Sequence, residues 1–180
     1  MFNKLKLTNT ELNLLYYLSL QKEPKYSKQI SKETKISAGS ASQSLRNLLN
    51  KSLIKCNIKG KEKYYYIDKD NHFIKHLKLS LNILSVNNIV NKLKKFSTKI
   101  ILFGSYVTGL NTEESDIDLL IITNNKKKIN EILNKYKSSY KISSIILSNI
   151  EYTLLKNKDK SLYKEINKGI NLWNKRNEQI

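Results

Sequence analysis

Two short apolar runs in the second half of the chain limit its fold most strongly, because polar residues with specific chemistry adjoin each of them. The first run covers 100–103 and is followed at once by a Gly-Ser step. The second covers 119–122 and is preceded by two Asp residues. A short, continuous apolar run bounded by turn signals predicts a buried strand. The sequence therefore predicts a small sheet with polar residues gathered at one end of it.

The two acidic residues, Asp116 and Asp118, lie two positions apart, so on a strand their side chains project from the same face. Neighbouring carboxylates repel each other and favour a divalent cation with oxygen ligands between them, and we expect Mg²⁺. Gly104 has no side chain to obstruct a phosphate, and Ser105 adds a hydroxyl and backbone N–H groups that can donate to it. The alternative is a solvated strand end that carries two Asp residues by chance.

The order Gly104-Ser105, ten residues, Asp116-x-Asp118 is the GS-x(10)-DxD signature. The stretch 102–119 resembles the nucleotidyltransferase superfamily of polymerase-beta type, in particular its minimal members. The resemblance implies that Gly104 and Ser105 bind a nucleoside triphosphate, with ATP expected, and that the catalytic residues Asp116 and Asp118 bind Mg²⁺. It also implies in-line attack by an acceptor hydroxyl, on a protein, a tRNA end or a small molecule, with release of pyrophosphate.

Members of this superfamily usually supply a third carboxylate from a later strand, and here the resemblance is incomplete. After an expected helix over 126–136, the strand candidate 141–147 holds no acid, and Ser143 or Ser144 lies in the expected neighbourhood. The next acid is Glu151, expected in the following helix. Loss of one metal ligand weakens base catalysis more than nucleotide binding. Two hypotheses stay open: an active nucleotidyltransferase, and a catalytically degenerate regulator that senses nucleotide.

Residues 8–68 predict three helices and a basic hairpin. Thr8 and Glu11 form a capping-box pattern before the first helix, and a third helix is expected over 38–50. Strand-like runs over 53–58 and 63–67 flank a turn that contains Gly60. This arrangement resembles the winged helix-turn-helix of many prokaryotic transcriptional regulators.

The side of the third helix opposite its apolar stripe carries short polar groups and one guanidinium. These residues are Ser40, Gln43, Arg46 and Asn47. Such side chains can read base edges in the major groove, while the hairpin residues Lys59 and Lys61 would contact phosphate. The sequence therefore predicts DNA binding, with RNA less favoured. The alternative is a helical domain used for protein contacts or dimerisation, and a homodimer is one expected assembly.

The expected fold class is α+β, with three parts. A winged helix-turn-helix is expected over 1–70, a helical connector over 71–98, and a minimal nucleotidyltransferase domain with a small mixed sheet over 99–180. The tail over 150–173 has apolar residues at helical spacing, so we expect closing helices that cover the sheet. The expected function is transfer of a nucleoside monophosphate to a hydroxyl acceptor, coupled to DNA binding.

The charge and the cysteine content indicate the kind of partner and the cellular compartment to expect. Lysine and arginine number 33 against 15 acidic residues, a net charge of +18, which favours nucleic acid or another anionic partner. The abundance of Lys, Asn and Ile is also typical of a coding bias, so we give the charge little weight. The single cysteine, Cys56, excludes an intramolecular disulfide, and no apolar run is long enough to span a bilayer. We expect a soluble cytoplasmic protein without membrane contact.

Overall fold

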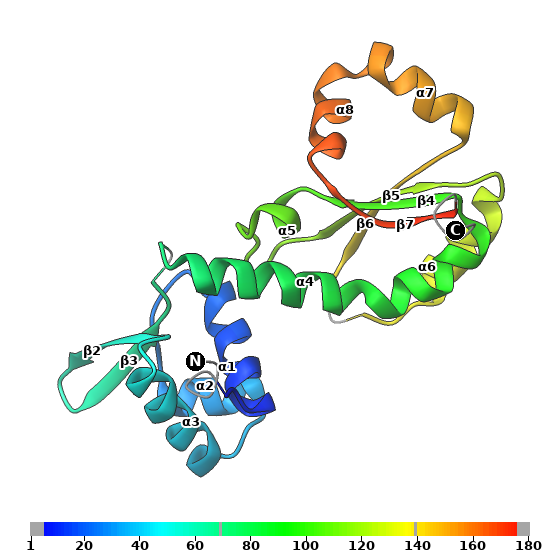
Figure 1. Ribbon diagram of the computed structural model, residues 1–180. Coiled ribbons are helices and arrows are strands. Elements are labelled where there is room, and N and C mark those ends of the chain that lie inside the picture. The colour runs from blue at the N-terminus through cyan, green and yellow to red at the C-terminus, as the bar shows by residue number, and fades with distance from the viewer. Residues whose placement is uncertain (1–5, 69, 139, 176–180) are drawn as a thin grey trace. The chain divides into compact units, whose positions relative to one another are not determined.

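The computed structural model describes residues 6–68, 70–138 and 140–175 and divides the chain into two compact units (Figure 1). The first unit ends at Lys78 and the second begins at Leu79. This boundary falls inside one long helix, α4 (His72–Leu93). Its first turns contribute Ile74 to the core of the first unit, and its last turns contribute Leu93 to a core of the second. The division of the chain at residues 70 and 98 stays a prediction.

The first unit consists of three helices and a three-stranded antiparallel sheet. Its elements are α1 (Asn9–Leu20), β1 (Lys25–Tyr26), α2 (Ser27–Thr34), α3 (Ala38–Asn50), β2 (Lys55–Lys59) and β3 (Glu62–Tyr66). The strand order is β1-β3-β2, and β2 and β3 form the predicted hairpin. Gly60 in its turn has a φ of 62°, a conformation that favours glycine. The predicted winged helix-turn-helix is confirmed.

One hydrophobic core joins the helices of the first unit. The predicted capping box begins α1: the Thr8 hydroxyl accepts from the Glu11 N–H, and the Glu11 carboxylate accepts from the Thr8 N–H. The fully buried centre of the core comes from all three helices, with Leu14, Leu15, Leu18, Ile30, Leu45 and Leu48. The apolar stripe predicted for α3 therefore faces inward, which leaves its polar side exposed.

The second unit is built around a four-stranded mixed sheet, as predicted. After α4 its elements are a 3₁₀ turn (Lys94–Phe96), β4 (Lys99–Phe103), α5 (Ser105–Thr108), β5 (Ile117–Ile122), α6 (Lys126–Lys135), β6 (Ile142–Leu147), α7 (Asn149–Lys158), α8 (Lys160–Asn167) and β7 (Ile170–Asn174). The strand order is β6-β5-β4-β7. The pair β5 and β6 is parallel, and β4 is antiparallel to both of its neighbours.

Helices cover both faces of this sheet. Successive residues of β4 point to opposite faces. Ile100 and Leu102 pack with α4 and α6, whereas Ile101 and Phe103 pack with α7 and α8. Figure 1 shows the same arrangement, with α4 and α6 on one side of the sheet and α7 and α8 on the other. Burial on both faces explains why β4 and β5 are continuously apolar instead of alternating.

The end of the tail is a strand, which corrects the prediction of helices up to residue 173. Ile170 of β7 pairs with Leu102 of β4. Gly169 permits this approach, because a Cβ atom at that position would lie 2.5 Å from the Leu102 carbonyl oxygen. Helical spacing of apolar residues carries no information about such a long-range pairing. In the residues that the structure describes, no helix combines the length and the apolar character needed to cross a membrane.

Candidate functional site

Gly104 lies where β4 ends, directly against the carboxylate of Asp118. Its φ of 71° and ψ of −148° lie in a region that residues with a side chain avoid. A Cβ atom on Gly104 would collide with Asp118 Oδ2 and lie 3.2 Å from Asp118 Cγ. The strand register produces this contact, since Phe103 pairs with Asp118. Position 104 therefore needs glycine for two reasons, and the predicted phosphate turn lies beside the predicted acid.

Asp118 is half-buried in β5, with strands on both sides. Its partner in β6 is Ser143, whose hydroxyl donates a hydrogen bond to the carboxylate. Burial raises the pKa of Asp118, the negative charges of Asp116 and Glu165 raise it further, and the Ser143 hydrogen bond opposes the shift. The ionised carboxylate is thus held in an unfavourable environment, which a bound cation would relieve.

Asp116 precedes β5 by one residue and pairs with Lys141. The Lys141 Nζ lies 2.7 Å from Asp116 Oδ2, and the side chains are 79% and 32% exposed. Hydrogen bonding to Asp116 and its negative charge raise the pKa of Lys141. The ammonium group of Lys141 therefore balances the charge of Asp116 at the edge of the site.

Ser105 begins α5, and its side chain is half-buried. Its carbonyl oxygen accepts a hydrogen bond from the Thr108 hydroxyl. No hydrogen bond joins the Ser105 hydroxyl to another residue that the structure describes. This hydroxyl is available to a ligand at the turn that Gly104 forms.

A buried amide pair, which the sequence analysis missed, fixes the loop between α5 and β5. Asn82 of α4 donates to the Tyr106 carbonyl oxygen at 2.9 Å and to Asn111 Oδ1 at 3.0 Å. Asn111 in turn donates to Asn82 Oδ1, and both side chains are almost completely buried. Buried amides that bond to each other and to the backbone hold a loop in one conformation. The pair therefore positions the segment that carries Ser105.

Among the residues that the structure describes, no third carboxylate joins Asp116 and Asp118 as a metal ligand. Ser143 occupies the strand position beside Asp118. Glu151 is engaged elsewhere: it caps α7 and pairs with Lys126, and these contacts lower its pKa to about 2. Within residues 6–68, 70–138 and 140–175, no group of three or more His, Cys, Asp or Glu side chains could hold a metal ion.

Sequence reasoning missed one further acid of this region, Glu165. It lies on the last turn of α8 and acts on Asp118 through its charge. The β7 register explains its place: Ile170 pairs with Leu102, so the residues before Ile170 continue toward the Gly104 end of β4. No pattern in the sequence marks Glu165, because its position follows from the unpredicted strand β7.

The donors at this site fit Mg²⁺ bound together with a nucleotide. Asp116 and Asp118 supply hard anionic oxygens, and a bare glycine turn beside them leaves room for phosphate. Mg²⁺ usually takes one or two carboxylates and completes its shell with water and substrate phosphates. Two carboxylates are therefore sufficient for a metal-nucleotide complex.

The predicted DNA-binding residues lie on the outer side of the first unit. Ser40, Gln43 and Arg46 are exposed on α3, and Lys59 and Lys61 are exposed at the hairpin. Arg46 forms no ion pair with a carboxylate in the described part of the chain. Lys59 Nζ lies 5.5 Å from the centroid of the Tyr64 ring. These exposed side chains are accessible to an anionic partner.

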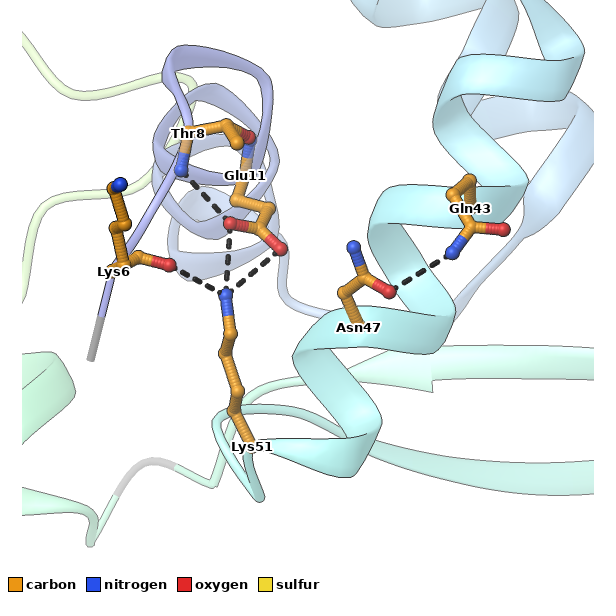
Figure 2. A network of polar contacts seen from close by, with 6 residues as sticks. All are labelled: Lys6, Thr8, Glu11, Gln43, Asn47 and Lys51. Atoms are coloured by element: carbon orange, nitrogen blue, oxygen red, sulfur yellow. Dashed lines mark hydrogen bonds and ion pairs between the residues drawn. The ribbon is translucent and has the colours of Figure 1, made fainter. Parts of the chain in front are cut away.

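Asn47, the remaining predicted DNA-binding residue, is half-buried and has partners on both sides. Gln43 Nε2 donates to Asn47 Oδ1 at 3.0 Å, and the Asn47 side chain also lowers the pKa of Glu11. Figure 2 shows that Lys51, just past α3, points at the same Glu11 carboxylate. Lys51 Nζ lies 3.0 Å from both Glu11 oxygens and 2.8 Å from the Lys6 carbonyl oxygen. Asn47 is therefore held by its neighbour on α3, and Lys51 joins the end of α3 to α1.

Comparison with known proteins finds a matching family model in each unit. Residues 83–172, half of the chain, match the family model described as Nucleotidyltransferase domain. Residues 8–55 match the model described as Bacterial regulatory protein, arsR family. The first match contains Gly104, Ser105, Asp116 and Asp118, and the second contains the polar side of α3.

A curated relative and a solved structure also match parts of the chain. A Methanocaldococcus jannaschii protein named "Putative protein adenylyltransferase" is 57% identical over 37 residues, which are 21% of this chain and 37% of that protein. The chain thus matches little more than a third of that relative's length. The zinc-responsive MarR family member ZitR of Lactococcus lactis aligns at 18% identity with a TM-score of 0.42, over 52% of this chain and 65% of that one.

Proposed function

The chain belongs to the nucleotidyltransferase domain family, and we propose that it transfers a nucleoside monophosphate from a nucleoside triphosphate to a hydroxyl group. The close approach of Gly104 to the Asp118 carboxylate carries this proposal. Nucleotidyl transfer needs a turn that admits phosphate next to carboxylates that hold a cation. A strand end with only a structural role needs neither a turn that admits phosphate nor a pair of carboxylates.

We assign the triphosphate to Gly104 and Ser105, and Mg²⁺ to Asp116 and Asp118. When bound, Mg²⁺ would neutralise charge on the phosphates and on the departing pyrophosphate. The Ser105 hydroxyl would donate to a phosphate oxygen. In the reaction, the acceptor oxygen forms a bond to the α-phosphorus, the bond to pyrophosphate breaks, and the acceptor proton passes to solvent.

Our proposed donor is ATP, and our proposed acceptor is a protein hydroxyl. Support comes from the name of the M. jannaschii relative, whose matching segment is 57% identical to this chain. The acceptor end of a tRNA is the second choice, because a chain with net charge +18 attracts polyanions.

The first unit supports a second activity, DNA binding. Its arsR-type match and the exposed side chains of Ser40, Gln43 and Arg46 are the basis of this proposal. These residues would enter the major groove, while Lys59 and Lys61 would contact phosphates of the backbone. Asn47 would contribute mainly by holding Gln43, to which it is hydrogen-bonded.

A second candidate function for the second unit is nucleotide sensing without transfer, and Ser143 favours it. Ser143 lies beside Asp118 where a further carboxylate could have served as a base or metal ligand. A hydroxyl there cannot bind a second cation as a carboxylate does. In this case nucleotide binding at the same residues would regulate DNA binding, with no pyrophosphate released.

One experiment separates the two candidates. Purified protein is incubated with Mg²⁺ and labelled ATP, alone, with total tRNA and with cell lysate, and both pyrophosphate and labelled acceptor are measured. The Asp118→Asn and Asp70→Asn variants are run in parallel, since Asp70 is an exposed acid in the first unit. Pyrophosphate release that Asp118→Asn abolishes and Asp70→Asn retains supports transfer. Tight ATP binding without release supports sensing.

A further inference from the structure

A pocket in the second unit lies at the opposite end of its sheet from Gly104 and Asp118. It has a volume of about 730 Å³ and is bounded by the start of β4, the end of β7 and the first turns of α7. In β4, Lys99 pairs with Ile122 and Asn174, whereas Phe103 pairs with Asp118. Lys99 and Phe103 are four positions apart on the strand, about 13 Å. The pocket is therefore distinct from the proposed transfer site.

The lining of this pocket is cationic and polar. It includes the ammonium groups of Lys99 and Lys175, the amides of Asn149 and Asn174, and the hydroxyl of Thr153. No Asp or Glu is among its lining residues. Neither lysine pairs with a carboxylate in the part of the chain that the structure describes. Two positive charges without a carboxylate partner among the described residues thus face one concave space.

Tyr152 defines one wall of the pocket and holds Lys99 in place. The Lys99 Nζ lies 5.6 Å from the centroid of the Tyr152 ring, and Tyr152 in turn packs on Tyr163. Burial of Tyr152 raises the pKa of its phenol, so Tyr152 stays a neutral hydrogen-bond donor. The ammonium group of Lys99 is therefore directed by an aromatic ring and not by an acid.

We propose that this pocket binds a phosphorylated ligand of nucleotide size, either a free nucleotide or a terminal nucleotide of a strand. Its volume lies in the usual range of small-molecule sites, about 300–1,000 Å³. Two lysine ammonium groups match the charge of a phosphate, which lysine binds as a point charge. The Asn149 amide supplies hydrogen bonds to the remaining polar groups, and the Thr153 hydroxyl, which donates to the Asn149 carbonyl oxygen, can accept one. This proposal does not depend on the proposed transfer activity, because the pocket shares no residue with the proposed transfer site.

The test is equilibrium dialysis of labelled AMP against the Asp116→Asn/Asp118→Asn protein in EDTA, which removes metal-dependent binding at the first site. We expect saturable binding that Lys99→Gln/Lys175→Gln weakens by about tenfold or more, the effect of losing charged hydrogen bonds. The matched control is Lys135→Gln/Lys158→Gln, which removes two exposed lysines outside the pocket. We expect it to change the affinity by less than about twofold.

A variant without a charge change gives an independent test. Thr153→Trp fills the pocket from the exposed side of α7, so it should also prevent AMP binding. Ribose 5-phosphate and a short single-stranded RNA, used as competitors, distinguish a free ligand from a strand. Absence of saturable AMP binding overturns the proposal, and so does an equal loss in the two double lysine variants, which would indicate general attraction to a basic surface.

Discussion

At residue 104, both the backbone and the space around it require glycine. We predict that Gly104→Ala abolishes Mg²⁺-dependent ATP binding, because the new methyl group displaces the Asp118 carboxylate. Its positive φ adds strain, so the free energy of unfolding should fall by about 1–3 kcal/mol. ATP titration and thermal denaturation of the same samples measure the two effects.

The matched control is Gly39→Ala. Nothing lies within 4 Å of a Cβ atom at Gly39, which is inside α3. Alanine is preferred over glycine in a helix by about 1 kcal/mol, so this variant should be at least as stable as the wild type and should bind ATP normally. Wild-type ATP binding by Gly104→Ala would show that the turn and Asp118 do not form one site.

Lys141 is the side chain that a cation must compete with at Asp116. Their contact is exposed, and such ion pairs contribute about 0–1 kcal/mol. We predict that Lys141→Met raises the affinity of the nucleotide-free protein for a divalent ion by up to about fivefold. Mn²⁺ binding followed by electron paramagnetic resonance measures it. Lys137→Met, at an exposed position, is the control, and equal or weaker Mn²⁺ binding by Lys141→Met would refute the competition.

At the scale of elements, the Glu11 network joins α1 to the end of α3 (Figure 2). Burial raises the pKa of Glu11, but the Thr8 backbone hydrogen bond and Lys51 outweigh it, and the net shift is downward from 4.5. A lowered folded-state pKa stabilises the protein above the unfolded value and loses this contribution as pH falls through the folded value. Glu11 should therefore stabilise the first unit at neutral pH.

We predict that Glu11→Gln lowers the free energy of unfolding at pH 7 by about 1–3 kcal/mol, the effect of losing charged hydrogen bonds. The difference from the wild type should shrink as pH falls below 4.5. Denaturant titrations at several pH values measure it, with Glu23→Gln, an exposed acid of the same unit, as control. A difference that stays constant down to pH 3 would contradict the role of Glu11 ionisation.

Elements with local signals were predictable from the sequence. The capping box of α1, the hairpin around Gly60 and the apolar strands β4 and β5 depend on neighbouring residues, and each appears in the structure. The proximity of Gly104 to Asp118 was also anticipated, because their spacing is part of a family signature. Local patterns thus gave the main architecture of both units.

Features that depend on distant residues were not predictable. Strand β7 exists because Ile170 pairs with Leu102, and Gly169 permits the approach. The Asn82 and Asn111 pair joins residues 29 positions apart, and Lys141 reaches Asp116 across 25 positions. No periodicity or spacing rule connects such residues, since the contacts form only when the sheet and α4 have assembled.

At the scale of the whole molecule, the charge of +18 predicts salt-sensitive attraction to nucleic acid. We predict that Lys59→Gln and Lys61→Gln weaken DNA binding on all sequences alike and reduce its salt slope by about one each. Arg46→Ala should instead reduce the difference in affinity between preferred and random DNA. Fluorescence anisotropy at several salt concentrations measures both, and a uniform loss on Arg46→Ala would show that Arg46 contacts only phosphate.

The most direct test of the proposed transfer site is ATP binding by the whole protein, measured by equilibrium dialysis with Mg²⁺ and with EDTA. Wild type, Asp116→Asn, Asp118→Asn and the control Asp70→Asn are compared. We predict that Mg²⁺ strengthens ATP binding in the wild type and in Asp70→Asn, and that either substitution at Asp116 or Asp118 removes the effect of Mg²⁺. Equal, Mg²⁺-independent affinity in all four proteins would contradict the assignment of Asp116 and Asp118 as the metal site.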